Sequence, residues 1–306
     1  MVSVKRGIYY MVHNRAQFCD SIVKNFFAWL PDKLYLSLRY HFKMGRWIDW
    51  KNPKTFTEKI QWLKVYNRKP VYTTMVDKYA VKQYVSNLIG REFIIPTLGV
   101  WDRAEDIEWD SLPEQFVLKT THGGGSGGVV ICKNKFEFDR CAAIAKLNES
   151  MSSDIYSNLR EWPYKNVRKR ILAEKLIAFG KESVSTELWD YKFFCFNGEV
   201  RFFKVDFGRF VEHHANYYSP DGKLLDFGEA DYAPVPCAGI VLPKNLKEMV
   251  VLAEQLSKGE SFLRVDLYNV DGKIYFGELT FYPASGMGKW TSDDVDRELG
   301  EYLRLQ

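Results

Sequence analysis

The chain has 306 residues, of which 46% are hydrophobic and 27% are charged, and its formal net charge is +4. This length can bury a full core with two or three subdomains around one cleft, and so small a charge argues against a general nucleic-acid binder. No apolar run reaches 18 residues, so no membrane span is expected. The first ten residues lack the apolar segment and cleavage site of a signal peptide. Five cysteines without a CxxC spacing favour a reducing, cytoplasmic location.

The N-terminal part is basic, since residues 1–50 carry eight Lys or Arg and three Asp or Glu. Apolar residues recur there at helical spacing, and Pro31 is expected to start a second helix. They are Phe18, Ile22, Phe26, Trp29 and Leu30. The spacing predicts an apolar face packed on the rest of the protein. The alternative is a helix on a membrane surface. The basic residues that would then face anionic lipid are Lys24, Lys33, Arg39, Lys43 and Arg46.

Two further helices are predicted over 57–66 and 77–85, and Pro96 and Pro113 are expected to bracket a linker. Next, two apolar runs within 116–132 flank a loop with five glycines and Ser126. Backbone without Cβ atoms can approach closely, so the N–H groups of such a loop can surround a polyphosphate while Lys119 adds a charge. A flexible hairpin turn is the alternative. The Walker A pattern is absent, and no helix of a Rossmann motif follows.

After the loop, 136–150 and 152–161 are predicted as helices and 170–177 as a strand. From Tyr191 onward the pattern is typical of antiparallel strands. One hairpin is expected to turn at Asn197-Gly198 and a second at Asp271-Gly272. The chain is therefore expected to be an α+β protein.

The second hairpin carries a pair of acidic residues, Asp266 and Glu278. A turn at Asp271-Gly272 places the two residues opposite each other, with both side chains on one face. Two adjacent carboxylates require a positive partner, and Mg²⁺ is usually held by one or two carboxylates plus substrate phosphates. Ion pairs with Arg264 and Lys273 are the alternative. Glycine loop, lysines and carboxylate pair together indicate ATP-dependent phosphoryl transfer.

These features resemble the TupA-like family of the ATP-grasp superfamily, associated with teichuronopeptide and surface-polysaccharide gene clusters. The resemblance covers the chain from about Asn52. Its landmarks are Thr55-Phe-Thr-Glu-Lys-Ile-Gln-Trp-Leu, Val76-Asp-Lys-Tyr-Ala-Val, Phe116-Val-Leu-Lys with the glycine loop, Asp190-Tyr-Lys-Phe-Phe-Cys-Phe-Asn-Gly-Glu, and Arg264-Val-Asp-Leu-Tyr through Phe276-Gly-Glu-Leu-Thr-Phe-Tyr-Pro.

The resemblance implies an ATP-grasp fold, with two α+β lobes and a glycine-rich lid over the nucleotide. The expected division is a helical basic and aromatic region at 1–70, an N-terminal lobe with the lid at 71–173, and a C-terminal core with the metal site at 174–306.

The resemblance also implies roles for individual residues. Lys192 would face the γ-phosphate, and Thr280 would join the Mg²⁺ ligands Asp266 and Glu278, although many ATP-grasp enzymes have Asn where this chain has Thr280. The implied ATP contacts are Lys78, Lys119, Gly123, Gly124, Gly125, Ser126, Gly127, Glu174, Lys175 and Leu176.

Many ATP-grasp enzymes also place an arginine shortly after the last metal ligand, and this chain has none there. Lys289, Arg201 or Arg209 is therefore expected to supply that charge. We expect Arg209, together with His213, His214 and Tyr217, to line the acceptor side; two solvated loop histidines are the alternative for the His pair.

The predicted activity is that of a carboxylate–amine ligase that consumes ATP with Mg²⁺ and acts through an acyl-phosphate. Its expected partners are a sugar-, lipid- or nucleotide-linked glycan carboxylate and an amine or amino acid, without nucleic acid and with contact to the membrane surface as an option. A sugar kinase is the nearest alternative. A glycosyltransferase using Asp294-Val-Asp296 and a non-catalytic nucleotide-binding scaffold are the other two.

Overall fold

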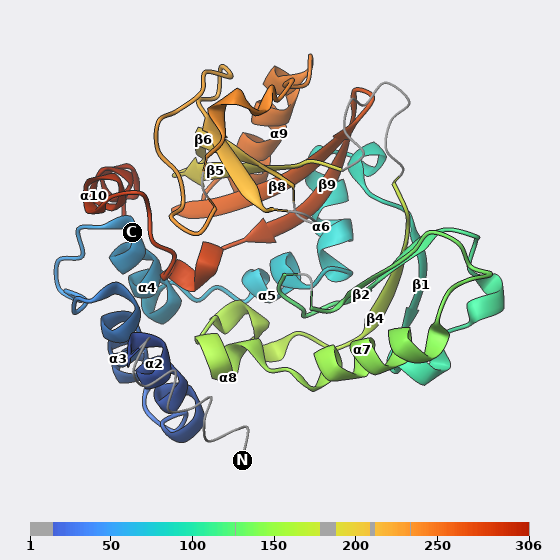
Figure 1. Cartoon of the computed structure of the whole chain (residues 1–306), viewed down its shortest axis with the longest axis horizontal. Helices are drawn as coiled ribbons and strands as arrows, with labels where there is room; N and C mark the ends of the chain where they lie inside the picture. Colours follow the sequence, from blue (N-terminus) through green and yellow to red (C-terminus); the bar gives the residue numbers. More distant parts are fainter. Residues whose placement is uncertain (1–14, 126, 178–187, 209–211, 233, 306) are drawn as a thin grey trace.

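A computed structural model describes residues 15–125, 127–177, 188–208, 212–232 and 234–305. Its strands form two antiparallel sheets, one of four strands in the order β1-β4-β2-β3 and one of five in the order β7-β6-β5-β8-β9. The two sheets lie in separate parts of the molecule, and the N-terminal helices lie along one side (Figure 1). The predicted α+β class with two lobes and a helical N-terminal region is confirmed.

The N-terminal region contains α2 (Arg15–Phe26), α3 (Asp32–Met44) and α4 (Phe56–Tyr66), followed by α5 (Val71–Val76) and α6 (Ala80–Ile89). The start of α3 directly after Pro31 confirms the predicted break. None of the helices that the structure describes is both long and apolar enough to cross a membrane.

The four-stranded sheet is built from β1 (Thr97–Trp101), β2 (Phe116–Thr120), β3 (Val129–Cys132) and β4 (Ile171–Lys175). Between β3 and β4 the chain forms α7 (Arg140–Ser152), α8 (Ile155–Leu159) and a 3-10 turn at Trp162–Asn166. The expected linker between Pro96 and Pro113 is wrong in part, because β1 lies within it and pairs with β4. A strand of five residues with Gly99 at its centre is too short for its alternation to stand out.

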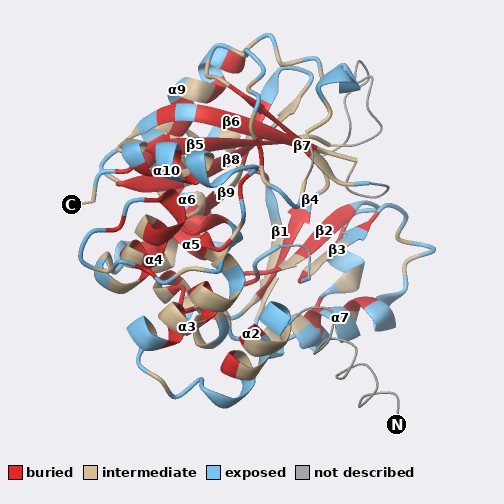
Figure 2. Cartoon of the chain, turned by 60° about the vertical axis from the view of Figure 1, so that its left-hand side comes forward, coloured by how far each residue is buried: buried red, intermediate tan, exposed pale blue. Residues whose placement is uncertain are grey.

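The five-stranded sheet contains β5 (Asp190–Phe196), β6 (Glu199–Phe207), β7 (His214–Tyr218), β8 (Phe262–Val270) and β9 (Lys273–Thr280). Both predicted hairpins are confirmed, since Asn197 and Asp271 adopt positive φ angles of 53° and 50° before their glycines. Helix α9 (Leu246–Ser257) packs against β5, β6 and β8. It covers the face that carries Cys195, whose thiol lies 3.7 Å from the Ala253 carbonyl oxygen. Buried residues are therefore concentrated in this sheet and its helices (Figure 2).

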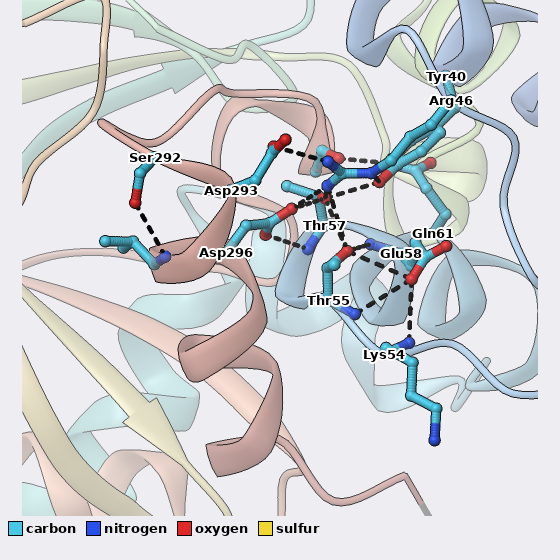
Figure 3. Close-up of polar contacts among 12 residues, drawn as sticks. Tyr40, Arg46, Lys54, Thr55, Thr57, Glu58, Gln61, Ser292, Asp293 and Asp296 are labelled. Atoms are coloured by element: carbon cyan, nitrogen blue, oxygen red, sulfur yellow. Dashed lines mark hydrogen bonds and ion pairs between the residues drawn. The ribbon is translucent and has the colours of Figure 1, made fainter.

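Helix α4 is joined to the C-terminal helix α10 (Asp293–Tyr302) by a buried polar network (Figure 3). Thr55 and Glu58 form a capping box at the start of α4. Asp296 accepts hydrogen bonds from the Thr57 backbone N–H (2.9 Å) and hydroxyl (2.6 Å), and its other partner is the Arg46 guanidinium. The contact is close, because a Cβ on Gly300 would lie 2.1 Å from the Lys54 carbonyl oxygen.

This network removes the basis for a glycosyltransferase motif at Asp294-Val-Asp296. The Asp296 side chain is 3% exposed and holds Arg46, whereas that of Asp294 is 91% exposed. The two carboxylates therefore do not form one metal site. Arg46 likewise does not face lipid as the membrane-surface alternative required, and neither does Arg39, which is buried against Asp20 at 2.6 Å.

We expect Asp296→Ala to destabilise the protein by about 2 kcal/mol, because Arg46 and the Thr57 N–H lose a buried partner. Urea unfolding measures the change. Asp294→Ala, on the exposed side of the same helix, is the matched control and should change the free energy of unfolding by less than about 0.5 kcal/mol. Equal effects of the two substitutions would contradict the role given to the network.

Candidate functional site

The face of the five-stranded sheet opposite α9 carries a row of charged side chains. Cross-strand pairing places Glu278, Asp266, Lys192 and Lys204 side by side on β9, β8, β5 and β6. Lys192 Nζ lies 2.5 Å from Asp190, 2.6 Å from Asp266 and 3.8 Å from Asp206. The row continues through Lys204, which lies 2.7 Å from Glu229. Charges are thus paired across four of the five strands of the sheet.

The predicted opposition of Asp266 and Glu278 is confirmed by the register of β8 and β9. Arg264, on the same strand as Asp266, lies between the two carboxylates. Its Nη2 donates to Asp266 Oδ2 (2.7 Å), Glu278 Oε1 (2.9 Å) and Thr280 Oγ1 (3.0 Å). The positive partner that this pair requires is therefore Arg264. Lys273 takes no part and instead lies over the Tyr275 ring.

Burial and charge act in opposite directions on these carboxylates. For Glu278, burial favours the neutral acid, but Lys78, Arg264 and Lys192 outweigh it and hold the pKa well below its usual range. For Asp266, burial outweighs the neighbouring Arg264 and Lys192, and the pKa is raised. The pair therefore combines one strongly ionised carboxylate with one that is harder to ionise, and added positive charge would favour both charged forms.

These residues fit a divalent cation. Two carboxylates and a hydroxyl surround one cationic nitrogen of Arg264. Their oxygen atoms are ligands of the kind that Mg²⁺ prefers. Negative charge is also in excess, because five carboxylates meet four cations in the described part of the chain. The carboxylates are Asp190, Asp206, Glu229, Asp266 and Glu278, and the cations are Lys78, Lys192, Lys204 and Arg264.

Lys78 connects this row to the glycine loop. Its Nζ donates to the Gly123 carbonyl oxygen at 2.6 Å and lies 3.6 Å from Glu278. In the other sheet, Lys119 lies 2.6 Å from Glu174, which also pairs with Lys82 at 2.5 Å. The structure thus brings the predicted Lys78, Glu278 and glycine loop together. It places Lys119 with Glu174, and the backbone runs on from Glu174 through Lys175 to Leu176.

The glycines of the loop have two different roles. A Cβ on Gly123 would lie 2.5 Å from Thr120 Oγ1, and one on Gly128 would lie 2.3 Å from the same atom. These two glycines permit the close packing at the base of the loop. Gly125, at φ +64°, and Gly127 have no atom within 4 Å of a built Cβ, so the tip is open to a ligand. Ser126 lies outside the described residues.

Not every predicted residue joins the row. Arg201 pairs with Glu199 at 2.8 Å and stacks on Tyr302, away from the cluster, and the Lys289 side chain is exposed. His214 pairs with Glu212 at 3.7 Å. Arg209 lies outside the described residues.

Of the expected acceptor residues, His213 contacts the row through Asp206, and Tyr217 lies beside Lys204, whose Nζ is 6.0 Å from the centre of its ring. His213 Nε2 lies 3.3 Å from Asp206 Oδ1. Tyr217 is fully buried among Phe202, Phe227 and Trp290, because its strand position faces the aromatic core at this end of the sheet. A contact between Tyr217 and substrate would require this packing to open.

Sequence analysis missed several members of the row. They are Asp190, Lys204, Asp206 and Glu229, with Lys82 in the other lobe, and Arg264 was considered only as an ion-pair partner. A signal was present for most of them. In the first hairpin, Asp190 and Lys192 are two residues apart on one strand, and Lys204 and Asp206 are two residues apart on the other. A turn at Asn197-Gly198 places Lys192 opposite Lys204 and Asp190 opposite Asp206.

A left-handed turn follows β9, and side chains of α4 bind its backbone. Ala284 and Ser285 have φ angles of 47° and 55°, which are strained for residues with a Cβ. The Gln61 amide donates to the Ser285 and Gly286 carbonyl oxygens at 2.9 and 2.8 Å. Lys64 Nζ donates to the Ser285 carbonyl and hydroxyl oxygens, both at 2.7 Å. The N-terminal region therefore supports a segment that begins two residues after Thr280.

Comparison with known proteins identifies the family. A sequence profile described as TupA-like ATPgrasp matches residues 58–304. The chain belongs to the TupA-like ATP-grasp family. A comparison with curated protein sequences found no match.

Solved structures similar to this chain include the following two enzymes. D-Alanine–D-alanine ligase from Bacillus anthracis, complexed with ATP, is 17% identical over 68% of this chain and 54% of its own, with a TM-score of 0.39. N5-carboxyaminoimidazole synthetase from Staphylococcus aureus, complexed with ADP, is 13% identical over 81% of this chain and 58% of its own, with a TM-score of 0.46. This chain thus spans little more than half the length of either protein.

We expect Lys64→Met to loosen the turn after β9. Burial lowers the pKa of Lys64 to about 7, and the variant would lose its three hydrogen bonds and leave the buried Glu161 without its nearby cation. The expected cost is about 2 kcal/mol, with faster amide hydrogen exchange in residues 284–288. The control is Lys69→Met, which replaces a half-exposed lysine five residues further along the chain. Unchanged exchange in the turn would show that Lys64 does not hold it.

We expect titration of His122 to lower the free energy of unfolding as the pH falls. Burial, with Lys169 and Lys78 nearby, lowers its pKa below 6.5, so the unfolded chain takes up a proton before the folded one does. The contribution is present above pH 6.5 and is lost as the pH falls from there toward the lowered folded-state pKa. Urea unfolding between pH 7.5 and 5 measures this, and His122→Gln serves as the reference that lacks the titration. Parallel pH curves for the two proteins would refute the assignment.

Proposed function

We propose that this protein is an ATP-dependent ligase that joins a carboxylate to an amine through an acyl-phosphate. The observation that carries the proposal is the oxygen cage of Asp266, Glu278 and Thr280 around Arg264, next to Lys192. A carboxylate has no leaving group at neutral pH, so it must be activated, and transfer of a phosphoryl group from ATP achieves this. Such a reaction depends mainly on positioning and on neutralising charge.

The residues divide into two groups by what they would bind. Lys78 and the open tip of the glycine loop would hold the phosphates of ATP, and Lys119 with Glu174 would hold the nucleoside end. Mg²⁺, when bound, would neutralise phosphate charge and take Asp266, Glu278 and Thr280 as its protein ligands. Lys192 lies between Asp266 of this cage and Asp206, at the end of the row that contains Lys204.

Arg264 is the residue best placed to hold the reacting carboxylate. Its guanidinium already binds two carboxylates, and its fork of donors suits both a carboxylate and an acyl-phosphate. We assign to it the positive charge that sequence analysis sought in Lys289, Arg201 or Arg209. Removing it should affect the chemical step more than the binding of ATP.

We further propose that the amine enters from the Lys204 end of the row. His213, with its Nε2 3.3 Å from Asp206, is placed to accept the proton that the amine loses as it attacks the acyl-phosphate and displaces phosphate. A row of ion pairs favours a polar acceptor such as a uronic-acid unit, and an amino acid as the amine. Membership of the TupA-like family supports a role in surface-polysaccharide synthesis.

Phosphorus NMR of the protein with Mg-ATP, uronic-acid sugars and amino acids tests the proposal. We expect phosphate release only when both carboxylate and amine are present. Glu278→Gln and Lys192→Met should each lower turnover on the order of a hundredfold. The matched control is Glu199→Gln, an exposed glutamate of the same sheet that should leave turnover unchanged.

Other outcomes would identify a different function. A new phosphoester signal in place of phosphate would establish a kinase. Thermal-shift binding of Mg-ATP that survives in Glu278→Gln, without turnover in either protein, would indicate a non-catalytic nucleotide-binding protein.

A further inference from the structure

The exposed aromatic side chains of the described residues gather in one region. Five of seven lie in the helical region of residues 15–70, and Phe26 and Trp29 are 72% and 75% exposed. Leu34, one turn into α3, is 48% exposed. The expectation that Phe26 and Trp29 pack on the body is therefore wrong, because α2 ends at Phe26 and the helical spacing does not continue to Trp29. The five exposed aromatic residues of this region are Phe26, Phe27, Trp29, Trp47 and Tyr66.

The turn between α2 and α3 is held firmly while its apolar side chains face solvent. The Arg160 guanidinium donates to the Ala28 carbonyl oxygen, and Trp29 Nε1 donates to the Phe26 carbonyl oxygen at 3.1 Å. On α3, Tyr35 and Arg39 donate to the Asn158 carbonyl oxygen at 2.9 and 2.6 Å. These bonds anchor the inner side of the helix pair to α8. Because α2 and α3 lie at the edge of the molecule (Figure 1), the turn between them is an anchored segment that carries exposed apolar side chains.

Charge separates this region from the rest of the chain. Residues 15–70 contain twelve Lys or Arg and four Asp or Glu, a net charge of +8, whereas residues 71–306 have a net charge of −6. Some of these basic side chains bind within the protein, as Arg39 and Arg46 do. Others are exposed and form no ion pair with the described residues. They are Lys33, Lys43, Lys51 and Lys54.

We propose that the α2–α3 turn docks this protein on an anionic lipid bilayer. Phe26, Trp29 and Leu34 insert at the level of the headgroups, and Lys33 and Lys43 of α3 contact the acidic headgroups. Exposed Trp and Phe side chains next to Lys are typical of segments that bind a membrane interface. Burial of apolar surface and attraction to anionic headgroups both favour binding there. Single-stranded nucleic acid would instead need a basic groove with stacking faces, whereas these side chains project from a turn. The proposal does not depend on the ligase assignment.

Co-sedimentation of the full chain with vesicles tests this. We expect binding to vesicles of phosphatidylcholine with phosphatidylglycerol, little binding to phosphatidylcholine alone, and release at high salt. The variant Phe26→Ser/Trp29→Ser/Leu34→Ser should bind roughly tenfold more weakly or worse. Lys33→Glu/Lys43→Glu should lose the preference for anionic lipid. Folding of each variant is checked by thermal unfolding.

Matched controls lie on the opposite lobe. Phe136→Ser removes a 96% exposed aromatic residue, and Lys133→Glu reverses an exposed lysine; neither should alter sedimentation. Quenching of tryptophan fluorescence by brominated lipid should decrease in Trp29→Phe. Absence of sedimentation at low salt would overturn the proposal, and so would equal binding by the parent and the triple-serine variant. Binding to single-stranded RNA that vesicles do not compete would overturn it in favour of a nucleic-acid partner.

Discussion

The site depends on burying more negative than positive charge on one face of a β-sheet. Carboxylates removed from water must be paired or neutralised, and here each one meets a lysine or an arginine of the same strand or of a neighbouring one. Strand register enforces the pairing, since Lys192 lies directly opposite Asp266 on one side and Lys204 on the other. A slip of one residue in any of these strands would turn its charged side chains toward α9. Burial of the apolar face of the sheet therefore also fixes the register that forms the charged row.

Helix α4, in the N-terminal region, binds two segments that are distant from it in sequence. Its first turn binds Asp296 of α10, and its later turns hold the carbonyl groups of the strained turn after β9. The segment that begins at Thr55 therefore has a structural explanation independent of any ligand. Because the strained turn follows β9, which carries the proposed metal ligands Glu278 and Thr280, the N-terminal region is part of the framework of the candidate site. An isolated pair of lobes would lack these supports.

Sequence alone predicted the features that local rules govern. Asn197-Gly198 and Asp271-Gly272 determine two hairpins, and hairpin arithmetic then places Asp266 opposite Glu278. It could not show that Arg264 would lie between them, because a side chain on the same face can also point along the strand or into solvent. The surroundings of Tyr217 could not be predicted either, because the aromatic residues that enclose it come from three separate segments.

The pairing within the site also bears on how a nucleotide would enter. Each lysine expected to meet a phosphate already has a carboxylate or carbonyl partner: Lys78 binds Glu278 and Gly123, Lys119 binds Glu174, and Lys192 binds Asp190 and Asp266. Folding has thus already removed these charges from much of their water. Entry of Mg-ATP would exchange partners, with phosphate oxygens taking the lysines and the metal taking the released carboxylates. Such an exchange avoids most of the desolvation that bare charges would require, and it makes binding of the metal and of the phosphates mutually dependent.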